Sequence, residues 1–162
     1  MSSFDRRAFL ALLPAALAAC GFEPVYAPGG AASTLSGRVE VQELTTTEGY
    51  LLVRDLEERL GRPQAPAYKL GLDLEIESQG QAVTETDDTT RYSVVGRLSY
   101  ELTPYGSVDV IAAGEVSNFT GYSATGSTVE TLAAQRDAHA RLMTILADQV
   151  ATKLFATADL PA

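Results

Sequence analysis

Residues 68–76 read YKLGLDLEI, and they carry the clearest structural signal in the sequence. Apolar side chains occupy every second position of this stretch, and polar residues or glycine fill the positions between them. Because successive side chains of a β-strand point to opposite faces, the alternation predicts a strand with one apolar face. Such a strand fits a sheet that packs on one side and meets water on the other.

Two neighbouring stretches repeat this period of two. Residues 92–102 alternate in the same way, and residues 104–107, PYGS, predict a turn. The period continues at Val108, Val110, Ala112 and Val116, which predicts that the returning strand of a hairpin begins directly after the turn. The polar segment Ser78–Thr90 is longer than a tight turn of about 2 to 5 residues, so the strands are expected to extend into part of it.

Helical periods flank this group of strands. Residues 39–42 predict a short first strand, and Thr45 with Glu48 forms a capping box before a helix of about 12 residues that Gly61 stops. Its predicted outer face is formed by Arg54, Asp55, Glu57 and Glu58. A second, long helix is predicted from about Thr128 to Phe155. The order β-α-β-β-β-α predicts an α+β two-layer sandwich, with two helices on one face of a four-stranded, mostly antiparallel sheet.

The N-terminus has the pattern of an export signal. Arg6 and Arg7 precede a run of about a dozen mostly apolar residues, too short to span a bilayer, which needs about 20. The run ends in Leu17-Ala18-Ala19-Cys20, which matches a lipobox and predicts that Cys20, the only cysteine, becomes the lipid-modified first residue of the mature chain. The arginine pair leaves both general secretion and twin-arginine export open.

These signals divide the chain into four parts. Residues 1–19 are predicted to be the signal peptide, and residues 20–36, rich in Gly, Ala, Pro and Ser, a flexible tether. Residues 37–156 are predicted to form one domain, and residues 157–162 a frayed tail. Without Asp5, Arg6 and Arg7 the mature chain has 10 basic and 20 acidic residues, a net charge of −10. That charge argues against nucleic acid and against broad electrostatic adhesion to anionic membranes.

No catalytic constellation is visible in the sequence. The single histidine, His139, falls on or beside the apolar stripe of the last helix, and this favours a packed residue over a ligand or a base. Neither a Gly-x-Ser-x-Gly elbow nor a nucleotide-binding glycine loop is present. The acidic run 85–88 lacks the ordered ligand pattern of a calcium loop and favours a solvated loop. We therefore expect no cofactor, no metal and no enzyme activity.

Arg91 and Arg97 are the candidate ligand-binding residues. Both fall on the polar face of the strand that contains residues 92–102. Guanidinium groups suit bidentate binding of phosphate, and these two stand out against an acidic background. The alternative is that they pair with carboxylates of neighbouring strands, at Glu75, Glu77 or Glu115.

Residues 20–26, CGFEPVY, resemble the mature start of LptE-family lipoproteins, and the predicted element order also resembles that family. The resemblance implies a non-enzymatic lipoprotein of the outer membrane, on its periplasmic side. Its implied partner is the β-barrel LptD, with which it forms a heterodimer, plugs the lumen, assists assembly and contacts lipopolysaccharide. The strand-end loops at Ser78–Thr90 and Pro104–Ser107 are the expected contacts. The rival interpretations are a solitary periplasm-facing lipoprotein that binds a small ligand or a cell-wall component, and a hydrolase with an unrecognised site.

We predict that the substitution Cys20→Ala blocks acylation, because it removes the thiol that accepts the lipid, and that unprocessed precursor accumulates. Mass spectrometry of protein extracted from membranes is the measurement. An unmodified thiol at position 20 of the wild-type protein would contradict the lipoprotein interpretation.

Overall fold

The computed structural model describes residues 30–83 and 89–157. The predicted signal peptide, Cys20 and the acidic run 85–88 lie outside the described residues. The elements in chain order are α2 (Ala31–Leu35), β1 (Val39–Val41), α3 (Thr47–Leu60), β2 (Tyr68–Val83), β3 (Thr89–Pro104), β4 (Ala112–Ser123) and α4 (Thr128–Thr157).

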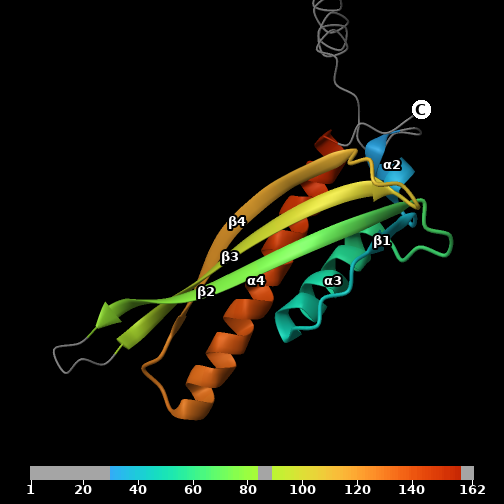
Figure 1. Cartoon of the computed structure of the whole chain (residues 1–162). Coiled ribbons are helices and arrows are strands. Elements are labelled where there is room, and N and C mark those ends of the chain that lie inside the picture. Colours follow the sequence, from blue (N-terminus) through green and yellow to red (C-terminus); the bar gives the residue numbers. More distant parts are fainter. Residues whose placement is uncertain (1–29, 84–88, 158–162) are drawn as a thin grey trace, which may run out of the picture.

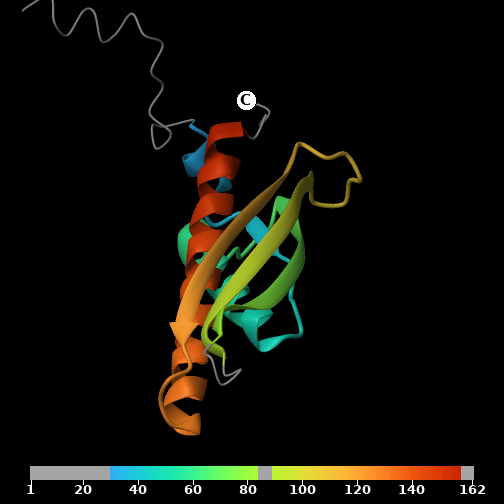
Figure 2. The same cartoon turned by 90° about the vertical axis from the view of Figure 1, so that its left-hand side faces the viewer.

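The four strands form one sheet in the order β1-β2-β3-β4. β1 runs parallel to β2, since α3 carries the chain back between them, and the other two pairs are antiparallel. α3 and α4 lie on one face of the sheet, which curves over them (Figures 1 and 2). The predicted α+β sandwich is therefore confirmed, with α2 as an additional element at its start.

The core lies between this face and the helices, and it follows the predicted alternation. Leu70 and Leu72 of β2 and Leu98 and Leu102 of β3 are buried, whereas the alternating residues Lys69, Asp73, Glu75 and Arg97 are exposed. The helices complete the core with leucines that have no exposed surface, such as Leu52, Leu56, Leu142 and Leu146. Burial of apolar area at about 25 cal/mol per Å² makes this the main stabilising contact of the domain.

A glycine sets how closely α4 approaches the sheet. A Cβ atom at Gly96 in β3 would lie 2.9 Å from Leu146 Cδ1 and 3.1 Å from Leu142 Cδ2. The absence of a side chain at this position lets two leucines of α4 sit directly on the strand. A larger residue would push the helix away from the sheet, because well-packed interiors have little room for added atoms.

Three local expectations need correction. Residues 31–35 were predicted as tether, but they form α2, and its Leu35 is fully buried against the core. β4 begins at Ala112 and not at Val108, because hydrogen bonds from Ser107 N to Pro104 O and from Asp109 N to Ser107 Oγ curl the chain after the turn. The N-cap of α3 is Thr46, whose Oγ1 accepts from Gly49 N at 3.0 Å, so the predicted Thr45–Glu48 capping box is wrong.

Asp55 also differs from expectation. It was placed on the wet face of α3, but it is only 3% exposed. Its carboxylate accepts a hydrogen bond from Thr144 Oγ1 of α4 at 2.8 Å and forms an ion pair with Arg54 at 2.7 Å. A buried carboxylate is tolerated only when it is paired and hydrogen-bonded, and the second helix supplies part of that pairing. Asp55 thus joins α3 to α4.

His139 makes a second polar contact between the helices. Its Nδ1 lies 2.9 Å from Glu48 Oε1 in the first turn of α3, and the two side chains are 15% and 29% exposed. Burial works to raise the pKa of Glu48, but hydrogen bonds with its own backbone and with His139, and the attraction of a protonated His139, lower it below its ordinary value. The expectation of a packed helix residue fits this position.

We predict that Leu72→Asp destabilises the domain by several kcal/mol, because it places an unpaired charge in the core. Glu75→Ser, on the exposed face of the same strand, should change stability little. Thermal melts of the two variants make the comparison, and equal losses would contradict a two-faced sheet.

We predict that Glu48 stabilises the fold in a pH-dependent way. A carboxylate whose pKa is lowered on folding contributes stability above its ordinary pKa of 4.5, and this contribution is lost as the pH falls through the folded value. The advantage of the wild type over Glu48→Gln in unfolding free energy should therefore shrink between about pH 6 and about pH 3. Denaturant titrations across that range are the measurement, and a constant difference would exclude the linkage.

Candidate interaction surface

The face of the sheet that the helices leave uncovered carries alternating charged side chains from three strands. Strand register brings these positions together, since Glu75 lies opposite Arg97, and Arg97 lies opposite Ser117. The exposed charged residues are Lys69, Asp73, Glu75 and Glu77 from β2, Arg91, Arg97 and Glu101 from β3, and Glu115 from β4. This open face is therefore mixed in charge with an acidic excess, which suits contact with a polar surface.

Arg91 and Arg97 project from this open face, as predicted. Six residues separate them along β3, so their backbones are about 20 Å apart and the two guanidinium groups do not form one site. Arg97 stands across from Glu75, yet neither arginine forms an ion pair within the described residues. Both guanidinium groups thus remain candidates for an external anion.

A small apolar patch interrupts the charges of the open face. Phe119 of β4 is 69% exposed and lies opposite Val95 of β3 in the sheet register. The sequence analysis did not single out this pair. The sequence does contain the signal for an exposed aromatic residue here. Ala112 and Val116 are on the buried side of the alternation in β4, and Phe119 is on its outward side. An exposed aromatic ring beside charged neighbours is a common feature of contact surfaces.

The long strands give the domain two separate ends. We call the end that holds the last residues of β2 and the first residues of β3 the hairpin end, and the opposite end the α2 end (Figure 1). At the hairpin end Tyr92 and Tyr122 stack with ring centroids 5.2 Å apart. β3 has 16 residues, so the two ends lie about 50 Å apart. The described residues of the first expected contact segment, 78–83 and 89–90, belong to β2 and β3, and they lie at the opposite end of the molecule from Pro104–Ser107.

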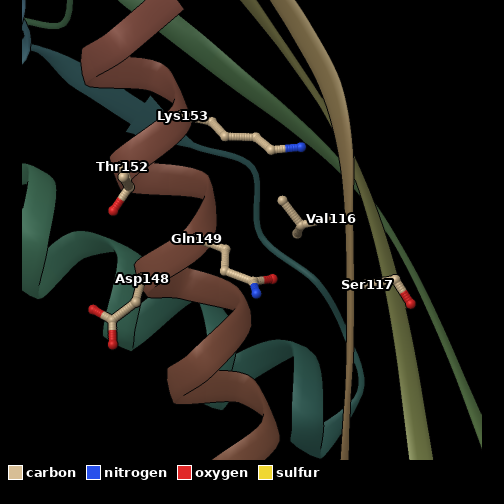
Figure 3. A pocket seen from close by; sticks show the side chains of 6 residues that line it. All are labelled: Val116, Ser117, Asp148, Gln149, Thr152 and Lys153. Atoms are coloured by element: carbon tan, nitrogen blue, oxygen red, sulfur yellow. The ribbon is translucent and has the colours of Figure 1, made fainter.

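A pocket of about 430 Å³ lies between β4 and α4 (Figure 3). Gln149 and Lys153 point from the helix toward the strand, and Val116 points back toward the helix. Lys153 Nζ donates to Glu115 O at 2.7 Å, while Gln149 Oε1 is buried without a hydrogen-bond partner in the described part of the chain. Arg141 likewise donates to Gly121 O at 3.3 Å. These contacts cover backbone carbonyl groups at the outer edge of β4. We therefore interpret the side chains around the pocket as protecting this edge strand from pairing with another chain.

A second pocket, of about 510 Å³, lies between α3 and α4 beside the Glu48–His139 pair. Leu51 and Leu132 line it together with the hydroxyl-bearing Thr47. The His139 Nε2 atom is buried and has no partner within residues 30–83 and 89–157. The contact between Glu48 of α3 and His139 of α4 makes the pair a link between the two helices.

The described residues hold neither a metal-binding cluster nor a membrane-spanning helix. No group of three or more His, Cys, Asp or Glu side chains there is arranged to hold a metal ion. None of the helices in that part of the chain is both long and apolar enough to cross a membrane. The chemistry that the described surface offers is recognition by charge, by guanidinium groups and by exposed aromatic rings.

Solved structures share this fold. A protein from Caulobacter crescentus CB15 superposes with a TM-score of 0.65 at 21% identity, over 79% of this chain and 95% of that one. Rare lipoprotein B from Shewanella oneidensis gives a TM-score of 0.57 at 10% identity, over 74% and 93% of the two chains. A minor lipoprotein from Acinetobacter baumannii gives 0.54 at 14% identity, over 76% and 95%. At these identities the likeness establishes the fold alone.

Sequence comparison adds the family. No curated protein matches the chain. The family model described as LptE, lipopolysaccharide-assembly, matches residues 35–154, which run from the end of α2 to the last turns of α4. This match covers most of the chain and agrees with the resemblance of residues 20–26. The chain therefore belongs to the LptE family, the lipopolysaccharide-assembly family.

Proposed function

We propose that the mature protein is a lipid-anchored component of the outer membrane that assembles with an LptD-type β-barrel and works as its plug and folding partner. The observation that carries this proposal is the family match over residues 35–154. The lipobox at residues 17–20 adds the anchor, and the absence of a catalytic constellation in the sequence favours a structural role over an enzymatic one.

The shape of the domain suits insertion into a pore. The hairpin end lies about 50 Å from the α2 end, which exceeds the roughly 30 Å hydrocarbon thickness of a bilayer. The interior of a large transmembrane barrel is polar, and the open face of β2, β3 and β4 offers charges of both signs to it. A rigid, elongated body of this kind can fill a wet lumen without burying unpaired apolar surface.

The hairpin end is the part that we assign to the lumen. The described chain begins at the α2 end, and only nine residues lie between Cys20 and Gly30. The anchored lipid would therefore hold the α2 end near the membrane surface, and the hairpin end is free to enter the lumen of a barrel in the same membrane. This assignment keeps the expected contact at Ser78–Gln81 and moves residues 104–107 away from the lumen.

Lipopolysaccharide is the ligand that we propose for the arginines of the open face. Its phosphates match the bidentate geometry of guanidinium groups, and Arg91 lies at the hairpin end. The acidic residues around Arg97 would repel phosphate, since Glu75 faces Arg97 across the strand pair. Arg91 is therefore the stronger candidate of the two for contact with the lipid.

Photo-crosslinkers at Gln81 and Tyr105 test the proposal in living cells. Gln81 is exposed at the hairpin end, and Tyr105 is 56% exposed at the α2 end, so the pair forms a matched comparison within one protein. We expect Gln81 to crosslink to a barrel several times larger than this chain. Depletion of the protein should lower the amount of assembled barrel and make the outer membrane permeable to large antibiotics.

Negative results in these two experiments would contradict the proposal. If neither position crosslinks to a barrel, and if depletion leaves barrel levels and permeability unchanged, the plug role is wrong. A solitary lipoprotein that binds a small ligand or a cell-wall component then takes its place. If Tyr105 alone crosslinks to the barrel, the partnership stands and the proposed orientation is reversed.

A further inference from the structure

The loop between β3 and β4, residues 105–111, exposes apolar side chains that the fold does not use. Val108 is 92% exposed, Tyr105 is 56% exposed and Val110 is 51% exposed. The loop is nevertheless held in place, because Tyr105 N donates to Ala67 O at 2.7 Å and Ile111 N donates to Leu102 O at 2.9 Å. Three exposed apolar residues within six positions on a fixed loop form a cluster, which marks a contact surface more strongly than scattered single residues do.

This loop lies at the α2 end of the domain. Ala67, which accepts the hydrogen bond from Tyr105 N, donates its own N–H to Arg38 O at 2.8 Å. Arg38 in turn follows α2 by three residues, and its N–H donates to Leu35 O at 3.1 Å. Both views of the molecule place the loop and α2 at the same end (Figures 1 and 2). The apolar cluster therefore sits where the described chain begins.

The length of chain before that point limits the distance to the lipid anchor. Cys20 precedes Gly30 by ten residues, and a fully extended chain spans at most about 3.6 Å per residue. The acylated cysteine is therefore at most about 35 Å from Gly30, whereas the hairpin end lies about 50 Å from the α2 end along β3. This step rests on the proposed acylation of Cys20 and does not require the barrel partner.

We propose that residues 105–111 insert into the interface of the membrane that holds the Cys20 lipid and so orient the domain on it. Val108 and Val110 would enter the boundary between headgroups and acyl chains, where the ring of Tyr105 is also favoured. Arg38, exposed beside the loop with its guanidinium over the Tyr68 ring, can reach lipid phosphates. The occupant of the cluster is thus a lipid surface.

The acidic charge of the whole chain disfavours electrostatic adhesion to anionic lipid, but the proposed contact does not depend on such adhesion. Insertion of two valines and a tyrosine depends on apolar area, and the loop itself carries one charged residue, Asp109, whose carboxylate is engaged by Ser107 Oγ at 3.0 Å. Such a small loop binds a membrane weakly when it acts alone. The lipid on Cys20 keeps the loop close to the membrane at a high effective concentration. A weak affinity of the loop for the membrane is therefore enough to keep it inserted.

A tryptophan reporter tests the proposal directly, because the chain contains no tryptophan. Val108→Trp places a single fluorophore in the loop, and Phe119→Trp places one at a comparably exposed position of the open face, about 25 Å farther along the sheet. The full-length lipidated variants are reconstituted into vesicles of phosphatidylethanolamine and phosphatidylglycerol, with and without brominated acyl chains. Mass spectrometry first establishes that each preparation carries the lipid on Cys20.

We expect the emission of Val108→Trp to shift to the blue on reconstitution and to lose intensity with brominated lipid. Phe119→Trp should keep the emission of an exposed indole. Adding Val110→Asp to Val108→Trp should reduce the quenching, and far-ultraviolet circular dichroism verifies that the fold is retained. These results together would support insertion of the loop.

Two outcomes would overturn the proposal. One is equal and weak quenching at positions 108 and 119 in protein whose acylation is verified. The other is an indole emission of the Val108→Trp variant that responds only when a barrel protein is added, which would make a protein the occupant. Failure of the barrel partnership in cells would leave the vesicle result unchanged, so the two proposals fail separately.

Discussion

Helix α4 packs on the sheet at Gly96, where Leu142 and Leu146 occupy the space that a side chain would need. This contact requires a glycine in a strand, a position where glycine usually weakens the structure because it packs nothing and costs backbone entropy. Here the glycine allows a helix of 30 residues to lie along strands of 12 and 16 residues. The long, narrow form of the domain follows from the lengths of these strands and of this helix.

Polar contacts as well as leucines hold α4 to α3. Asp55 is buried beside Thr144, and Glu48 meets His139 half-buried at the other end of the contact. Arg59 of α3 adds an ion pair with Asp148 of α4. Hydrogen-bonded polar groups between two helices restrict the relative rotation that leucines alone would permit, because each donor needs its acceptor in one place.

The two ends of the domain differ in the side chains that they expose. The α2 end contains the start of the described chain and the apolar loop of residues 105–111. The hairpin end contains Arg91, the stacked Tyr92–Tyr122 pair and the last residues of β2. One end exposes apolar side chains, and the other exposes a guanidinium group beside a stacked pair of aromatic rings. The helices cover one face of the strands that connect the two ends, and α4 side chains cover the β4 edge. The open face of the sheet is therefore the main surface between the two ends.

Much of this could be read from the sequence because the relevant signals are local. The alternation at residues 68–76 sets which side chains enter the core, Gly61 ends α3, and the lipobox and residues 20–26 point to a lipoprotein of this family. The remainder depends on contacts between residues far apart in the chain. Asp55 looks like a surface residue until Thr144, 89 positions away, supplies its partner, and residues 31–35 look like linker until the core accepts Leu35. Val108 and Val110 continue a strand period, but the hydrogen bonds of the preceding turn remove them from the sheet, and only the path of the long strands places them at the opposite end from Ser78–Gln81. Periodicity reports which face a side chain occupies, whereas the pairing of distant groups and the position of each loop are set when the layers pack together.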